Sequence, residues 1–182
     1  TYYVIPGGII DKEGESRATS IYLVDRTIPM LPERLSNGLC SLRPNEEKLC
    51  YSAIFELDDE ANIKKYRIGR TIINSDRRFT YEEAQEIIET GEGDFNEEVL
   101  KLDALAKKLR GKRFDHGAIA FDREEVRFEI DKDGKPISVY FKEQKDSNKL
   151  IEEFMLLANK TVAEFIGKVH KNKKAKTFVY RI

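Results

Sequence analysis

The stretch that decides the predicted fold is residues 19–45, TSIYLVDRTIPMLPERLSNGLCSLRPN. It combines a short apolar run with two closely spaced prolines. The apolar residues within 21–24 suit a buried strand. Pro29 and Pro32 have no backbone N–H, so neither a strand ladder nor a helix can run regularly between them. Pro32 can instead occupy the first turn of a short helix that ends near Gly38. The pattern predicts a strand, a stiff connector and a short helix.

Outside this stretch the chain is rich in charge but balanced. It has 182 residues and a hydrophobic content of 40%, enough for one domain with its own core. Lys and Arg number 32 against 33 Asp and Glu, for a net charge of -1. The overall charge therefore does not favour a polyanionic partner, and any nucleic-acid contact must come from local clustering or from other parts of a protein.

Cysteine usage and hydropathy narrow the class further. Cys40 and Cys50 lack the CxxC spacing of a zinc site, which favours a reduced, cytoplasmic protein without a structural metal. No apolar run approaches the ~20 residues that a membrane-spanning helix needs, so no membrane partner is expected. Both ends, residues 1–5 and 177–182, are strand-like, whereas natural domain ends are usually polar and frayed. We therefore expect residues 1–182 to be a single-domain fragment of a larger protein.

Periodicity predicts alternating strands and helices along the rest of the chain. Thr80 and Glu83 form a capping-box pattern at the start of one helix, and Gly111 is expected to end the next. The fold class is therefore mixed α/β (α+β), with a mainly antiparallel sheet packed against a long C-terminal helix. The predicted elements are strands over 1–5, 48–59, 63–75, 118–122, 126–130 and 137–141, and helices over 11–18, 80–90, 96–109 and 147–171.

Several segments within residues 17–43 resemble one enzyme family. They are Arg17–Leu23, Ile28–Pro32, Leu35–Ser36 and Leu39–Arg43, which in this order resemble the signature of the RNase II and RNase R exoribonucleases, in the catalytic domain called RNB. The resemblance covers the whole chain, but the chain does not cover the whole RNB domain. The run Ser20–Arg26 favours the bacterial RNase R type over RNase II.

This resemblance implies a processive 3′-to-5′ exoribonuclease that degrades single-stranded RNA to 5′-mononucleotides, with no obligate protein partner evident. Its chemistry uses Mg²⁺ held by aspartates, which position water and neutralise the leaving oxygen. In the family those aspartates precede the strand where this chain begins, and a catalytic arginine follows the point where it ends. We therefore expect no catalytic residue and no metal ligand in this chain, and no activity from the chain alone.

Two aromatic residues are expected to hold the 3′ end of the RNA. From the local pattern alone, Tyr22 would be a strand tyrosine at the surface and Phe121 an ordinary core residue that alternates with Ile119. The family resemblance implies instead that Tyr22 and Phe121 close on the terminal bases as a clamp. Stacking on an aromatic ring accepts any base, because every base offers a π face.

Two further residues are expected to contact the sugar. Tyr81, just inside the Thr80 cap, would by pattern be a half-exposed first-turn residue, and the resemblance implies that it separates RNA from DNA through the 2′-hydroxyl. Helical periodicity places Glu152 at the border of the apolar stripe of the last helix and Glu153 on its solvated face. The resemblance implies that the Glu152 carboxylate accepts a hydrogen bond from a ribose hydroxyl.

Other charged groups have simpler interpretations. The acidic run 58–60 is better explained by a β-turn than by a metal site. The lysines of residues 168–176 suit a solvated helix end, with a weak phosphate contact as the alternative. His116 and His170 have no nearby nucleophile, so nucleophilic catalysis has no support.

Two other functions stay open at this point. One is a noncatalytic RNA-binding module on the same fold, which lost the aspartates. The other is an unrelated α/β scaffold, which would be supported if Tyr22 and Phe121 lay far apart.

Overall fold

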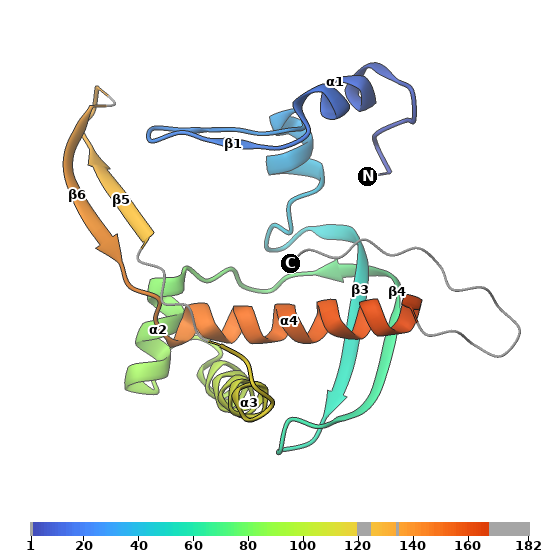
Figure 1. Ribbon diagram of the computed structural model, residues 1–182, viewed down its shortest axis with the longest axis vertical. Coiled ribbons are helices and arrows are strands. Elements are labelled where there is room, and N and C mark those ends of the chain that lie inside the picture. The colour runs from blue at the N-terminus through green and yellow to red at the C-terminus, as the bar shows by residue number, and fades with distance from the viewer. Residues whose placement is uncertain (1, 120–124, 134, 168–182) are drawn as a thin grey trace, which may run out of the picture. The chain divides into compact units, whose positions relative to one another are not determined.

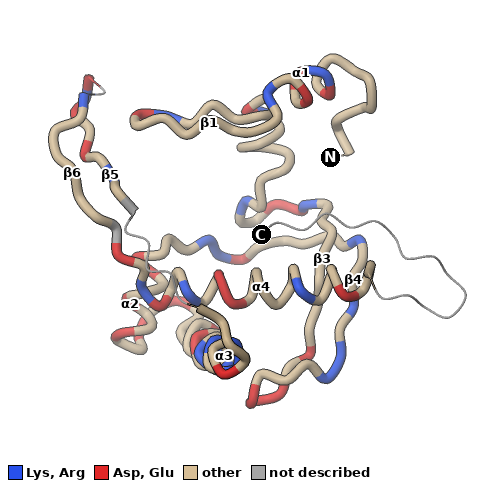
Figure 2. The backbone as a smooth tube through the Cα atoms, viewed as in Figure 1, with Lys and Arg blue, Asp and Glu red and all other residues tan. Residues whose placement is uncertain are grey.

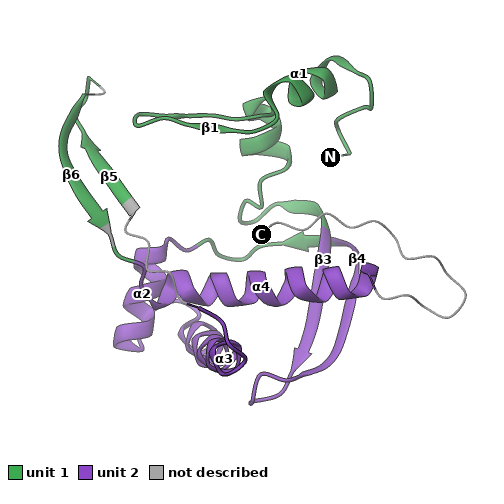
Figure 3. Ribbon diagram, in the orientation of Figure 1, with its two compact units in different colours: residues 1–50, 72–78, 122–143 green, residues 51–71, 79–121, 144–182 purple. Residues whose placement is uncertain are grey.

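The computed structural model describes residues 2–119, 125–133 and 135–167 of the chain. Its elements divide between two compact units (Figure 3). The first unit consists of residues 1–50, 72–78 and 122–143, and the second of residues 51–71, 79–121 and 144–182. Helices and antiparallel hairpins alternate along the chain and the last described helix is long, which confirms the mixed fold class predicted from the sequence.

A short hairpin in the first unit contains the beginning of the stretch 19–45. It follows α1 (Ile9–Arg17), and it pairs β1 (Ile21–Tyr22) with β2 (Thr27–Ile28) in antiparallel register. The ladder stops before Pro29, as the missing N–H requires. The buried strand predicted over 21–24 is wrong, because the side chains there are 45–79% exposed. A hairpin of two residue pairs is too short to cover either of its faces.

The helix predicted after Pro32 forms, but with a wider turn. It is the π-helix η1 (Arg34–Leu39), in which the Cys40 N–H donates to the Leu35 carbonyl five residues back at 2.9 Å. It ends at Leu39, close to the predicted end near Gly38. At the start of the chain, residues 2–4 form a turn and a bend, so the strand predicted over 1–5 is wrong in its described part.

Two longer hairpins appear where alternation predicts them. One two-stranded sheet consists of β3 (Glu47–Leu57) and β4 (Ile63–Asn74). Another consists of β5 (Glu125–Ile130) and β6 (Pro136–Lys142), which pair antiparallel with Phe128 opposite Val139. Between β3 and β4, the Asp58 carboxylate accepts from the backbone N–H groups of Glu60 and Asn62 at 3.0 and 2.9 Å. The acidic run therefore forms a turn, as predicted.

Three helices pack together in the second unit: α2 (Tyr81–Thr90), α3 (Asn96–Asp115) and α4 (Asp146–Gly167) (Figure 1). The capping box predicted for α2 is present, since the Thr80 N–H donates to Glu83 Oε2 at 2.7 Å and the Glu83 N–H to Thr80 Oγ1 at 3.1 Å. Helix α3 does not end at Gly111 but continues to Asp115. Glycine inside a helix costs about 1 kcal/mol, and tertiary contacts of the last turn offset that cost.

Those tertiary contacts include hydrogen bonds from two lysines in the last two turns of α3 to the β3–β4 turn. Lys112 Nζ donates to the Glu60 carbonyl at 2.6 Å and also to the Asn62 side chain. Lys108 Nζ reaches the Asp59 carbonyl and the Glu60 carboxylate, both at 2.8 Å. The β3–β4 turn is thereby fastened to α3 by hydrogen bonds.

Helix α4 buries only part of the face that periodicity predicts. Leu150 is buried, but Ile151, Met155 and Phe165 of the predicted apolar stripe are 52%, 53% and 48% exposed. The buried positions of this helix are Ser147, Leu150, Glu153 and Thr161. Three of these four are polar, so hydrophobicity alone could not identify the face that packs on α2 and α3.

Some predicted elements lie partly or wholly outside the described residues. The strand expected over 118–122 is absent at Ala118 and Ile119, and its remaining residues lie outside. The last residues of the long helix, the lysine cluster and the strand-like run 177–182 also lie outside.

Candidate functional site

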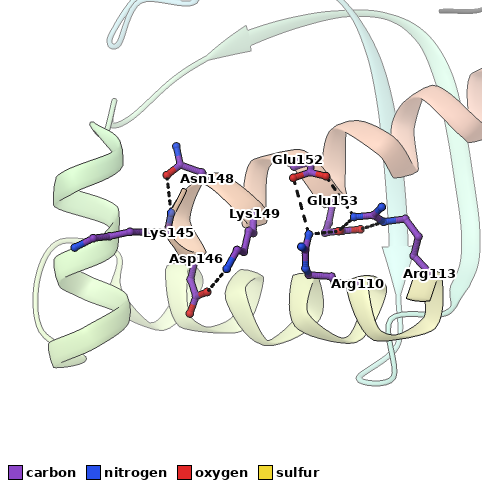
Figure 4. Close-up of polar contacts among 8 residues, drawn as sticks. All are labelled: Arg110, Arg113, Lys145, Asp146, Asn148, Lys149, Glu152 and Glu153. Carbon is purple, nitrogen blue, oxygen red and sulfur yellow. Dashed lines mark hydrogen bonds and ion pairs between the residues drawn. The ribbon is translucent and has the colours of Figure 1, made fainter. Parts of the chain in front are cut away.

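A cluster of charged side chains joins the C-terminal half of α3 to the middle of α4. It consists of Arg110 and Arg113 from α3 with Glu152 and Glu153 from α4, and we call it the α3–α4 charge cluster (Figure 4). The two arginines lie three residues apart, on one face of a helix. The two glutamates are adjacent in sequence, so about 100° of helix separates their directions.

Glu153 is the buried centre of this cluster. Its side chain is 3% exposed, and the Arg113 guanidinium contacts both of its oxygens, with Nη2 to Oε1 at 2.6 Å and Nε to Oε2 at 3.2 Å. Arg110 Nη1 adds a third hydrogen bond, to Oε1 at 3.3 Å. The sequence-based placement of Glu153 on a solvated face is therefore wrong. Facing arginines make burial of this carboxylate favourable, and no pattern within α4 alone reveals them.

Glu152 lies beside Glu153 but stays accessible. Its side chain is 38% exposed, and its Oε1 accepts from Arg113 Nη2 at 3.3 Å. Its Oε2 lies 3.9 Å from Arg110 Nη1, which is an ion pair but too long for a hydrogen bond. Glu152 is therefore partly exposed, whereas Glu153 is buried.

The two arginines are held on their other side by an aromatic ring. The guanidinium carbons of Arg110 and Arg113 lie 5.0 and 5.2 Å from the centre of the Phe114 ring. The hydrogen bond to Glu153, followed by its negative charge and that of Glu152, outweighs desolvation and raises the pKa of Arg113 above its ordinary value. Arg113 is a cation, as arginine always is in proteins, and its guanidinium contacts both glutamates and the Phe114 ring.

A second group of ion pairs joins α3 to α4 near the N-terminus of α4. Lys107 Nζ lies 2.7 Å from Asp103 Oδ2 and 3.3 Å from Asp146 Oδ2, and these two carboxylates raise its pKa. Most acidic residues of α3 lie in its first half and most basic residues in its second half, and Figure 2 shows residues of both signs on this helix. A small cavity of about 120 Å³ lies between the two ionic groups, lined by Asp103, Ala106, Lys107, Arg110, Asp146, Lys149, Leu150 and Glu153. Its carboxylates and cations largely pair with one another.

Tyr81 belongs to the same three-helix unit. It is the first residue of α2 and is 42% exposed, as its place after the cap predicts. One turn further on, Gln85 is buried and its Oε1 accepts from the Ser147 N–H at 3.0 Å. This bond ties α2 to the first turn of α4, and Glu152 follows Ser147 by five residues, about 7.5 Å along the helix.

Tyr22 lies in the other unit, on the β1–β2 hairpin. It pairs with Thr27 next to a tight loop in which the Leu23 N–H donates to the Arg26 carbonyl at 2.8 Å. Its side chain is 79% exposed, so its ring is accessible to a ligand. Phe121, the other residue of the predicted clamp, lies outside the described residues.

The described residues do not fit a Mg²⁺ site of the kind that the family resemblance implies. Within residues 2–119, 125–133 and 135–167, no three side chains among His, Cys, Asp and Glu come together as a possible set of ligands. The carboxylates of the α3–α4 charge cluster are occupied by arginines instead. No metal-dependent step is therefore assigned to these residues.

Sequence reasoning did not single out Arg110 and Arg113. A usable signal was present, because two arginines three residues apart on one helix match two adjacent glutamates on another. The signal becomes specific only once α3 and α4 are known to pack together.

Comparison with known proteins decides the family. A family model described as "RNB domain" matches residues 1–182, which is the whole chain. The chain belongs to the RNB domain family. Among curated relatives, it is 41% identical to the DIS3-like exonuclease 2 of Schizosaccharomyces pombe, over 94% of this chain and 20% of that protein. It is 36% identical to Ribonuclease R 2 of Lactococcus lactis, over 98% of this chain and 30% of that protein.

The solved structures agree with this assignment. The RNB chain superimposes on Mycoplasma genitalium RNase R in complex with double-stranded RNA with a TM-score of 0.84 and 28% sequence identity, covering 91% of this chain and 30% of that one. The chain thus spans about a fifth to a third of the length of these relatives. No helix among the described residues is long and apolar enough to span a membrane.

Proposed function

We propose that this chain is the central part of the RNB domain of a 3′-to-5′ exoribonuclease of the RNase R type, where it holds the 3′-terminal nucleotides of single-stranded RNA. The family match over the whole chain supports the nuclease class. The likeness to an RNase R bound to RNA supports an RNA ligand. In this proposal, Mg²⁺ ions supply the hydrolytic chemistry, and residues outside this chain hold them.

The single observation that carries the proposal is the difference between Glu152 and Glu153. Both carboxylates contact arginines, but Glu153 is 3% exposed and Glu152 is 38% exposed. Glu153 is therefore committed to the interior, whereas Glu152 can accept a further hydrogen bond. A carboxylate accepts strongly from a hydroxyl, and the 2′-hydroxyl is the group that distinguishes RNA from DNA.

The aromatic residues have complementary roles in this proposal. Tyr22, exposed on its hairpin, stacks on a terminal base, with Phe121 as the second face of the clamp. Tyr81 approaches the sugar together with Glu152. Stacking contributes about 1–3 kcal/mol per base without selecting sequence, which suits an enzyme that must accept any 3′ end.

The runner-up is a noncatalytic RNA-binding module with the same fold. It uses the same four residues and differs only in the metal ligands, which the described part of the chain does not contain. Magnesium-dependent release of mononucleotides by the full-length protein that carries this chain separates the two, because only the exoribonuclease releases them.

The test of the ligand role compares Glu152→Gln with wild type in that full-length protein. Affinities for a single-stranded RNA and for the DNA of the same sequence are measured with a chelator present, so that neither strand is degraded. Replacing a charge-assisted bond by a neutral one is expected to lower the RNA-to-DNA affinity ratio about threefold to tenfold.

The matched control is Glu86→Gln, an exposed carboxylate in the middle of α2. It makes the same chemical change away from the charge cluster and should leave the ratio unchanged. An unchanged ratio in Glu152→Gln would contradict the ribose contact.

A further inference from the structure

The Arg113 side chain divides its hydrogen bonds between the two glutamates of α4. Its Nε and Nη2 hold the two oxygens of Glu153, and the same Nη2 also reaches Glu152 Oε1 at 3.3 Å. An Nη nitrogen carries two hydrogens in a rigid planar group, so it can serve two acceptors at once. The geometry connects a buried carboxylate to an accessible one through a single guanidinium.

This guanidinium is itself immobilised. The bidentate contact with Glu153 fixes its plane, and Phe114 lies 5.2 Å from its central carbon. Glu153 in turn is buried at 3% exposure, so it gives the arginine a fixed anchor on α4. An exposed glutamate without such support would sample several rotamers and lose side-chain entropy on binding a ligand.

The remaining oxygen of Glu152 is the one left for a ligand. Arg113 holds Oε1, whereas within the described part of the chain Oε2 has only the 3.9 Å ion pair with Arg110. An ionised carboxylate has about four acceptor sites, so one arginine hydrogen bond leaves most of them available. The arrangement orients Glu152 without consuming its capacity to accept.

We propose that Arg113, anchored by the buried Glu153, is a positioning residue that orients the Glu152 carboxylate toward the ribose of the RNA. This inference rests on the proposed contact between Glu152 and the sugar, and it adds a specificity-determining residue on a different helix. Ligand groups held by a second set of interactions bind and discriminate better because less motion is lost on binding.

The test is a double-mutant cycle in the full-length protein that carries this chain. Arg113→Met removes the guanidinium while keeping an unbranched side chain. The substitution is made in the wild type and in Glu152→Gln. The readout is the ratio of affinities for single-stranded RNA and DNA of one sequence, with a chelator present. If Arg113 acts through Glu152, Arg113→Met lowers the ratio about threefold to tenfold in the wild type and has little further effect in Glu152→Gln.

A matched control tests the effect of losing an ion pair in general. Lys107→Met breaks the contacts with Asp103 and Asp146 in the same α3–α4 interface, away from Glu152. It should leave the RNA-to-DNA ratio unchanged. If Arg113→Met does not fold, Arg113→Lys decides the same cycle, because it keeps the charge and loses the bidentate geometry.

The outcomes separate the two proposals. An equal loss from the Arg113 variant in both backgrounds, or no loss in the wild type, would overturn the positioning role while the effect of Glu152→Gln upholds the ribose contact. The same loss from Lys107→Met would also overturn it, since any weakening of the interface would then suffice. No effect of Glu152→Gln itself would overturn the ribose contact and the positioning role together.

Discussion

Arg113 and Glu153, forty residues apart in sequence, make a bidentate ion pair whose shorter contact is 2.6 Å. The pair joins α3 to α4 at the point where Glu152 remains accessible (Figure 4). A buried carboxylate of this kind is stable only with its partners in place, because an unpaired buried charge is strongly unfavourable. The pair therefore sets the register between the two helices as well as the surroundings of Glu152.

Replacing Glu153 by Gln should weaken the α3–α4 interface. Gln keeps the size of the side chain but removes the charge that balances two arginines, so we expect the free energy of opening α4 to fall by about 1–3 kcal/mol. Hydrogen–deuterium exchange of α4 amides in the full-length protein measures this local opening. The exposed Glu86→Gln is the control, and equal protection of α4 in both variants would contradict the structural role of Glu153.

Replacing Tyr22 by Ala should change where degradation stops more than how fast it proceeds. Stacking is worth about 1–3 kcal/mol per base and acts on retention of the last nucleotides, not on the hydrolytic step. The sizes of the end products from a labelled single-stranded RNA, together with the initial rate, give both quantities for the full-length protein. Thr27→Ala, across the β1–β2 ladder, is a control at the same hairpin. Unchanged product sizes in Tyr22→Ala would argue against a clamp.

The chain of 182 residues by itself should not hydrolyse RNA. The described residues bring together no set of metal ligands, and the charge cluster is occupied by its own arginines. Incubation of the purified chain with labelled RNA and Mg²⁺, followed by separation of the products, measures this directly. Release of mononucleotides that grows with the amount of chain and stops with a chelator would show that the expectation is wrong.

Replacing Gly93 by Ala should destabilise the connection between α2 and α3. Gly93 has a φ of +133°, and a Cβ there would lie 2.8 Å from Ile87 Cγ1, where Ile87 is buried. Strain and overpacking together are expected to cost about 1–3 kcal/mol. Exchange of the α2 amides reports the loss, with Gly69→Ala as a control because nothing lies within 4 Å of a Cβ at that glycine. Equal protection in the two variants would contradict the close packing.

The sequence by itself determined the local elements whose signals lie within a few residues. The capping box at Thr80 and Glu83, the strand β3 and the hairpin of β5 and β6 all form as predicted, because each depends on neighbouring backbone groups and side chains. The segments resembling RNase II and RNase R also indicated the family, which the match over the whole chain confirms.

Only the tertiary structure decided which faces are buried. Periodicity assigned Glu153 to solvent and Ile151 to the interior, whereas Glu153 is 3% exposed and Ile151 is 52% exposed. It also placed the end of α3 at Gly111, before the turn that carries Arg113. A hydrophobic pattern reflects the cost of burying a charge such as that of Glu153. It does not show the partner, Arg113, that offsets this cost. That partner lies forty residues away, and its contribution exists only when the two helices meet.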